Sequence, residues 1–120
     1  MISFVGGEPL LREDLPSLMK YAADLGMKVE VVTNGFLMDS RVASVLARLE
    51  AKVLLSVDGA SKVTCESIRG QGAWKKIMTA VDVMNSAGLE FIPVMVITGL
   101  NAHEAGDFVS FSCDNGWKLA

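Results

Sequence analysis

Short apolar runs alternate with longer stretches of helical periodicity along this chain. The runs cover residues 2–5, 29–32, 53–57 and 91–97, and each is followed by a glycine or a polar residue. Apolar residues occupy most positions of a run rather than every second one, which is typical of strands buried on both faces of a parallel sheet. The pattern therefore predicts four parallel strands.

Three stretches with apolar residues at helical spacing separate the four predicted strands. The first begins near Asp14, a candidate N-cap, and ends at Gly26, which favours a helix stop. The second begins behind Asp39 or Ser40, and the third spans residues 74–84. Each stretch is long enough to form a helix that connects one parallel strand to the next.

The last part of the chain predicts one more helix and the start of another strand. Asn101 is a candidate N-cap for a helix that runs to about Gly116, and residues 117–120 could begin a strand. Pro93 has no amide hydrogen to donate, so an edge position or a local irregularity is expected in the fourth strand. The alternating order indicates an α/β domain over residues 1–120 with right-handed crossovers.

Small and polar residues follow all four predicted strands. The carboxyl ends of parallel strands share one edge of the sheet, where α/β folds build their sites. The residues at this edge are Gly6, Gly7, Glu8, Thr33, Asn34, Ser56, Asp58, Thr98 and Asn101. Each taken alone is also compatible with an ordinary turn or strand end.

Glu8 is the exception, because a turn explains the glycine pair before it but not the carboxylate. Paired glycines let a ligand approach the backbone closely. A carboxylate beside them favours a ligand with a cationic group such as an ammonium. Neither G-x-G-x-x-G nor G-x-x-x-x-G-K-[ST] occurs in the sequence, which disfavours a dinucleotide or nucleoside triphosphate site.

The composition fits a folded domain, since 51% of the residues are apolar. Fourteen acidic and 11 basic residues give a net charge of −3 and are scattered, which disfavours a nucleic acid or membrane partner. No apolar stretch reaches the roughly 20 residues of a membrane span, and no signal peptide is recognisable, so a cytoplasmic location is expected. Cys65 and Cys113 fit no metal-ligand spacing and are expected to be reduced thiols.

The ordered motifs resemble those of the radical S-adenosylmethionine enzymes. The motifs are F-V-G-G-E-P-L-L-R at 4–12, D-L at 14–15, T-N-G at 33–35, S-V-D-G at 56–59, I-R-G at 68–70, and V-I-T at 96–98 followed by Asn101. They are most similar to the branch with molybdenum-cofactor, pyrroloquinoline-quinone (coenzyme PQQ) and haem-biosynthesis members and with SPASM-type peptide-modifying, sulfatase-maturing enzymes. The resemblance spans almost the whole chain.

The resemblance implies a partial (β/α)6 TIM-like barrel, of which this chain would form about four βα units. In that family a 4Fe-4S cluster binds S-adenosylmethionine and cleaves it reductively to a 5′-deoxyadenosyl radical. The radical abstracts a hydrogen atom from the substrate, which would be a peptide or a cofactor precursor. The full-length parent is thus expected to be an oxidoreductase-type radical enzyme of cofactor biosynthesis or peptide modification.

The resemblance also implies roles for residues near the first two strands. Gly6, Gly7 and Glu8 would hold the methionyl ammonium, which agrees with the cationic ligand inferred from the residues themselves. Thr33 and Asn34 would line the rim beside them.

The remaining roles fall on the second half of the chain. Ser56 and Asp58 would contact the ribose or the methionyl carboxylate, and Arg69 could pair with that carboxylate. Arg69 is also compatible with a solvated helix terminus. Thr98 and Asn101 would lie near the adenosine.

The chain departs from the family at the cluster. The family holds its cluster with three cysteines spaced C-x3-C-x2-C, before the glycine-glycine-glutamate strand, and neither Cys65 nor Cys113 matches that motif. Without three thiolates a cluster has no protein ligands. The chain is therefore expected to be an internal part of a radical SAM core, its second to fifth strands, without the N-terminal cluster-binding portion or the C-terminal portion. Alone it is expected to bind no cofactor and to be inactive.

Two alternatives remain open at this stage. The chain could be a non-catalytic α/β binding or scaffold module that keeps part of the barrel. It could also be an unrelated flavodoxin-like or receiver-like domain, although only Asp58 could serve as a phosphoacceptor. Unpaired apolar strand edges further predict self-association.

Overall fold

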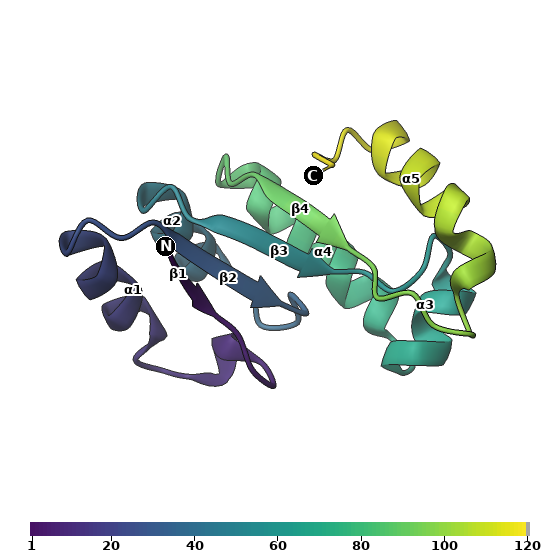
Figure 1. The fold of residues 1–120 in the computed structure, drawn as a ribbon, viewed down its shortest axis with the longest axis horizontal. Helices are drawn as coiled ribbons and strands as arrows, with labels where there is room; N and C mark the ends of the chain where they lie inside the picture. Colours follow the sequence, from purple (N-terminus) through teal and green to yellow (C-terminus); the bar gives the residue numbers. More distant parts are fainter. Residues whose placement is uncertain (120) are drawn as a thin grey trace.

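Four parallel strands form a single sheet in the computed structural model, which describes residues 1–119. The strands are β1 (Ile2–Phe4), β2 (Val29–Thr33), β3 (Lys52–Ser56) and β4 (Phe91–Val94). They lie in the order β1-β2-β3-β4, so each pairs with its neighbour in sequence. All four point the same way in Figure 1, and their carboxyl ends share one edge. The predicted parallel α/β sheet is confirmed.

The described residues also form five α-helices and two short 3₁₀ helices. The α-helices are α1 (Leu15–Asp24), α2 (Ser40–Arg48), α3 (Lys62–Arg69), α4 (Ala73–Ser86) and α5 (Ala105–Asp114). The 3₁₀ helices are η1 (Pro9–Leu11) and η2 (Ala102–Glu104). Helices α3 and α5 lie beyond the arrowheads of β3 and β4 (Figure 1), next to the edge that carries the candidate site.

Of the N-cap residues suggested by the sequence, Asp39 caps its helix with its side chain and Asp14 does not. Asp39 caps α2, since its carboxylate accepts a hydrogen bond from the Val42 amide at 2.8 Å. Asp14 precedes α1 as expected but makes no capping bond with its side chain. Its carboxylate pairs with Arg12 at 2.6 Å instead.

Besides α3, which is followed by Gly70 with φ of 93°, four α-helices are followed by a residue with positive φ, where glycine is favoured because it has no Cβ. Gly26, Gly88 and Gly116 follow α1, α4 and α5 with φ of 77°, 65° and 68°. Glu50 takes the same place after α2 with φ of 48°. The amide after each of these four residues bonds back to the last turn of its helix, at 2.8–3.1 Å.

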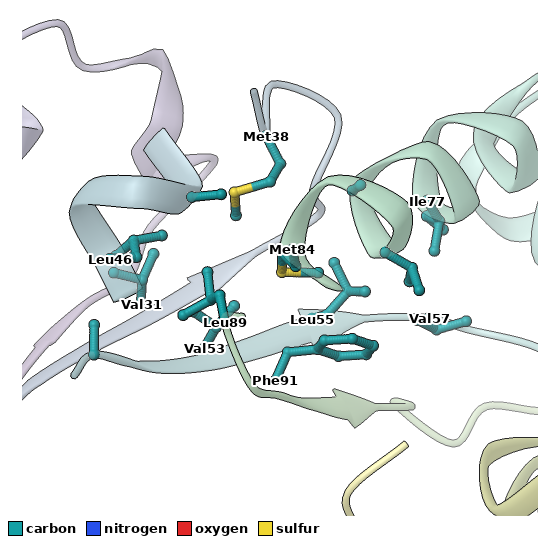
Figure 2. Packing of buried hydrophobic residues seen from close by; sticks show 14 of the residues in the cluster. Val31, Met38, Leu46, Val53, Leu55, Val57, Ile77, Met84, Leu89 and Phe91 are labelled. Carbon is teal, nitrogen blue, oxygen red and sulfur yellow. The ribbon is translucent and has the colours of Figure 1, made fainter. Parts of the chain in front are cut away.

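The hydrophobic core lies on one face of the sheet, under α1, α2 and α4. Figure 2 shows Val31 of β2 beside Leu46 of α2, and Leu55 of β3 beside Met84 of α4. These side chains are fully buried, and each contributes about 1.5–3 kcal/mol by leaving water. Burial alternates along β3 and β4, so the expectation of strands buried on both faces was wrong for these two strands within the described residues.

The sequence pattern missed α3 and extended β4 too far. Only Thr64 and Cys65 of α3 are buried, so the helix has almost no apolar stripe to reveal it. The predicted strand over 91–97 ends at Val94, because the backbone of Val96 bonds to the side chains of Asp58 and Asn101 rather than to another strand. Thr98 therefore lies in a loop and not at the strand end.

Asn101 does not cap the last helix with its side chain, contrary to the expectation from the sequence. The chain first forms η2, and α5 begins only at Ala105. The Asn101 side chain points back into the loop after β4, as described below.

Two expectations concern the edge of the sheet at β4. Pro93 pairs with Leu55 of β3, and β4 has no partner on its other side among the described residues, which confirms the edge position. The predicted strand start at 117–120 is wrong for residues 117–119, which form no strand, and Ala120 lies outside the described residues. Trp117 is buried instead against Phe91 and Phe111, with ring centroids 5.5 and 5.0 Å away.

Within residues 1–119, no helix combines the length and the hydrophobicity needed to cross a membrane.

Candidate functional site

The edge at the carboxyl ends of the strands divides into two groups of residues. We call Gly6, Gly7, Glu8, Thr33 and Asn34 the β1–β2 rim. We call Ser56, Asp58, Arg69, Thr98 and Asn101 the β3–β4 rim. Within the described part of the chain, no hydrogen bond between side chains of the two rims is present, so each can be described by itself.

Glu8 is the centre of the β1–β2 rim. Its Oε1 accepts hydrogen bonds from the Thr33 hydroxyl at 2.6 Å and from the Leu10 amide at 3.1 Å. Its Oε2 accepts one from the Asn34 amide at 2.8 Å. The carboxylate therefore bridges the loop after β1 and the end of β2, and it stays half-buried rather than enclosed.

Gly6 and Gly7 leave the backbone next to Glu8 open. Gly6 has φ of 136°, which side chains rarely adopt, whereas Gly7 has an ordinary φ. A Cβ added at either glycine would meet no atom within 4 Å. The peptide groups at the end of β1 are thus accessible to a ligand, and a negative charge lies beside them.

Thr33 and Asn34 complete this rim in different ways. Thr33 is 2% exposed, and its hydroxyl donates to Glu8 while it accepts from the Gly35 amide at 3.0 Å. Asn34 is half-buried, and its Oδ1 accepts from the Phe36 amide at 2.8 Å. Thr33 therefore orients Glu8, while Asn34 remains within reach of a ligand.

Asp58 belongs to a buried network in the β3–β4 rim. It is 7% exposed, and its Oδ1 accepts a hydrogen bond from the Val96 amide at 3.0 Å. Its Oδ2 pairs with Nη2 of Arg69 at 2.8 Å. Both carboxylate oxygens thus have partners inside the protein.

Asn101 is fully buried, and both the oxygen and the nitrogen of its side-chain amide have hydrogen-bond partners. Its Oδ1 accepts from the Thr98 amide at 2.7 Å. Its Nδ2 donates to the carbonyls of Asp58 at 3.1 Å and Val96 at 2.9 Å. Asn101 joins the loops after β3 and β4, and its amide has no capacity left for a ligand.

Arg69 ends α3 and is the cation of the site. Besides the pair with Asp58, its Nε is buried without a hydrogen-bond partner in the described structure. A buried donor without an acceptor is costly, so this nitrogen favours an anionic group nearby. The guanidinium is held by Asp58 and still has a donor to offer.

Ser56 and Thr98 are the accessible hydroxyls of the β3–β4 rim. Ser56 is half-buried at the end of β3, at a position that alternates with the core residues. Thr98 is exposed, and its hydroxyl accepts from the Leu100 amide at 3.2 Å. The neighbouring Val96, Ile97 and Leu100 are each 63% exposed, so an apolar surface lies beside Thr98.

Glu104 is a site residue that the sequence did not reveal. Its carboxylate accepts hydrogen bonds from the Ala60 amide, the Ser61 hydroxyl and the Thr64 hydroxyl, at 2.8, 2.8 and 2.7 Å. Burial acts to raise the pKa of this carboxyl, but the bonds from Thr64, Ser61 and Ala60 outweigh it, and the pKa lies below its usual range. The partners lie about 40 residues earlier, so no local motif could have indicated the contact.

The two cysteines do not fit an iron–sulfur cluster. Cys65 is buried in α3, and burial raises the pKa of its thiol more than the nearby Arg69 lowers it. Cys113 is exposed on α5. Among residues 1–119, no three His, Cys, Asp or Glu side chains group in a way that could hold a metal ion. No step of a reaction through a cluster can therefore be assigned to this chain's own residues.

The amino-acid sequence of the chain matches a known family. The sequence profile of the Radical SAM superfamily matches residues 1–112. The chain belongs to the radical SAM superfamily. The resemblance inferred from the rim motifs is thereby confirmed.

Relatives of this radical SAM chain include enzymes of cofactor formation. The AdoMet-dependent heme synthase of Methanosarcina barkeri is 33% identical over 88 residues, which cover 72% of this chain and 25% of the relative. The mycofactocin maturase MftC of Mycolicibacterium smegmatis is 28% identical over 120 residues, which cover 98% of this chain and 31% of the relative. The chain thus spans about a quarter to a third of the length of these curated relatives.

Solved structures with the same fold contain peptides. The structure of anSMEcpe with bound AdoMet and the Kp18Cys peptide matches with a TM-score of 0.84 and 24% identity, over 98% of this chain and 35% of that chain. Streptococcus suis SuiB bound to the precursor peptide SuiA matches with a TM-score of 0.78 and 19% identity, over 96% and 26%. These similarities confirm the expected fold, although the four described strands do not close into a barrel.

Proposed function

We propose that this radical SAM chain forms the S-adenosylmethionine-binding edge of an enzyme that modifies a peptide or builds a cofactor. The observation that carries the proposal is the open glycine pair beside Glu8, whose carboxylate is fixed by Thr33 and the Asn34 amide. A fixed negative charge next to accessible backbone groups suits the ammonium of a bound amino acid moiety.

The β1–β2 rim would hold the methionyl ammonium through Gly6, Gly7 and Glu8, with Asn34 beside them. Thr33 would act through Glu8, because its hydroxyl is already bonded to that carboxylate. A charge-assisted bond of this kind contributes about 1.5–3 kcal/mol.

The β3–β4 rim would hold the methionyl carboxylate and the adenosine. Arg69 has a buried donor without a partner and suits the methionyl carboxylate, together with the hydroxyl of Ser56. Thr98 and the exposed apolar side chains around it suit the adenosine.

Asp58 and Asn101 fit positioning better than direct contact with the ligand. The polar atoms of both side chains have partners inside the protein. We propose that Asp58 orients Arg69 and that Asn101 orients the loop that carries Thr98.

S-adenosylmethionine bound beside a reduced 4Fe-4S cluster is a source of the 5′-deoxyadenosyl radical, which abstracts hydrogen from a substrate. The residues of this chain offer no ligand set for that cluster. We therefore propose that the chain alone binds S-adenosylmethionine weakly and does not cleave it, whereas the sequence alone led to the expectation of no bound cofactor. The relatives named for haem synthesis and mycofactocin maturation, and the peptide complexes, favour a peptide or cofactor precursor as substrate.

A calorimetric titration of the chain with S-adenosylmethionine tests this proposal. Glu8→Gln should raise the Kd about 5- to 150-fold, which corresponds to roughly 1–3 kcal/mol. Glu13→Gln is the matched control, because Glu13 is an exposed carboxylate of the same loop and its replacement changes the net charge equally. An unchanged Kd in Glu8→Gln would remove Glu8 from the site. A wild-type chain that binds no S-adenosylmethionine would favour the alternative of a scaffold module.

A further inference from the structure

Glu104 links two segments of the β3–β4 rim that are far apart in the sequence. It is the last residue of η2, and its carboxylate accepts three hydrogen bonds from Ala60, Ser61 and Thr64, just before and at the start of α3. Two of the donors, Ser61 and Thr64, are themselves bonded to each other as the N-cap of that helix. The carboxylate thus holds the start of α3 as an additional cap.

Helix α3 is held at both of its ends. Glu104 bonds to its first turn, and the pair between Arg69 and Asp58 holds its last residue. The apolar contact of the helix with the core is small, since only Thr64 and Cys65 of its residues are buried. Polar contacts therefore decide where α3 lies, and with it where the Arg69 guanidinium lies.

Glu104 is also close in sequence to the loop that carries Thr98. Asn101, three residues earlier, fixes that loop through the Thr98 amide and the Val96 carbonyl. The Glu104 amide donates to the Asn101 carbonyl at 2.9 Å, so η2 is a hydrogen-bonded turn between the two residues. A movement of Glu104 would displace both the loop and α3.

We infer that Glu104 is a positioning residue that sets the distance between Arg69 on α3 and Thr98 on the loop after β4. The inference deepens the proposed function and rests on it, because it assigns to one carboxylate the spacing of the two groups that would hold the ends of S-adenosylmethionine. Glu104 would act on the ligand indirectly, because its carboxylate faces Ala60, Ser61 and Thr64 at the start of α3.

The substitution Glu104→Gln isolates this role with a small change of shape. A glutamine can accept hydrogen bonds through one oxygen only, so its amide nitrogen would face either the Ala60 amide or the two hydroxyls. At least one donor of the α3 turn would then lose its acceptor. Glu30→Gln is the matched control, because Glu30 is also a largely buried carboxylate with two partners, Ser3 at 2.7 Å and Lys52 at 3.0 Å. Glu30 is the second residue of β2, toward the opposite ends of the strands.

Amide hydrogen exchange of the ligand-free chain gives the first test. In Glu104→Gln, the Val96 and Thr98 amides, which donate to Asp58 and Asn101, should exchange about tenfold faster, while the Asn34 amide keeps its rate. Glu30→Gln should leave the Val96 and Thr98 amides at the wild-type rate. The inference would be overturned if Glu104→Gln left both amides protected or accelerated every amide alike.

Titration with S-adenosylmethionine gives the second test, at a temperature where both variants are folded by circular dichroism. Glu104→Gln should bind about tenfold more weakly and Glu30→Gln like the wild type. A loss of stability alone would not change the Kd of a fully folded chain, so equal affinity in Glu104→Gln overturns the inference. If the wild type does not bind at all, the proposed function fails, and the exchange rates alone decide whether Glu104 sets the spacing.

Discussion

In the β1–β2 rim a half-buried carboxylate lies beside two exposed glycines, whereas in the β3–β4 rim buried Asp58 and Asn101 bond to the loops around them. The first arrangement leaves backbone and charge accessible to a ligand. The second uses its polar atoms to hold Arg69 and Thr98 in place. Polar residues at strand ends thus serve two purposes in the same site, and the burial of the side chain distinguishes the two.

Replacing Asn101 and Asn34, one asparagine from each rim, should give the largest difference in stability between the two rims. Asn101→Ala should cost about 2–4 kcal/mol of unfolding free energy, because it leaves the Thr98 amide and two buried carbonyls without partners. Asn34→Ala should cost only about 0.5–1.5 kcal/mol, since its half-buried side chain accepts one bond. Urea unfolding followed by circular dichroism measures both. Equal losses would mean that the two rims do not differ in this way.

The glycines provide a second matched pair. Gly59→Ala should cost about 1–3 kcal/mol, because the new Cβ would lie 2.7 Å from the Cys65 amide nitrogen. Gly7→Ala should change the stability by less than about 0.5 kcal/mol, since its Cβ meets no protein atom within 4 Å. Thermal unfolding of both variants shows whether the turn at Gly59 is packed and the turn at Gly7 is open. A destabilised Gly7→Ala would indicate that the β1–β2 rim is packed too.

A smaller change in stability is expected at acidic pH, where the Glu104 carboxylate becomes protonated. The pKa of Glu104 is lowered in the folded chain, so its contribution to stability is present above the unfolded value of about 4.3 and is lost as the pH falls through the folded value. Glu104→Gln should therefore lose less stability than the wild type between about pH 5 and pH 3. Urea midpoints across this range report the difference, and parallel curves would contradict the role of the carboxylate.

The smallest expected change in stability comes from a substitution at Glu50, which lies outside both rims and serves as a reference. Glu50 has positive φ at the end of α2, where the other helices named above have glycine. Glu50→Gly should raise the unfolding free energy by about 0.5–1 kcal/mol and leave ligand binding unchanged. A loss of stability would show that the glutamate side chain contributes more than its backbone conformation costs.

The sequence predicted the strands and most helices well, because their signals are local. Apolar runs located β1, β2 and β3 to within about a residue. The run over 91–97 predicted too long a strand, since side chains from other loops take the backbone bonds of Val96. Helix α3 and the role of Glu104 were missed because both depend on polar contacts between segments about 40 residues apart.

The sequence predicted which residues form the candidate site, but not which of them contact the ligand and which hold other residues in place. Family motifs indicated Glu8, Asp58 and Asn101 alike as ligand contacts. Only the structure distinguishes the accessible Glu8 from the buried Asp58 and Asn101, because burial and bond partners depend on how the loops meet.

The affinity of Gly7→Ala for S-adenosylmethionine tests the account most directly. The added methyl group meets nothing in the protein but would occupy the space through which a ligand approaches the backbone beside Glu8. We predict a Kd at least about tenfold higher than that of the wild type at unchanged stability. The control Gly106→Ala in α5, where a Cβ also meets nothing, should bind like the wild type. Equal affinity of Gly7→Ala and the wild type would contradict the claim that the β1–β2 rim faces the ligand.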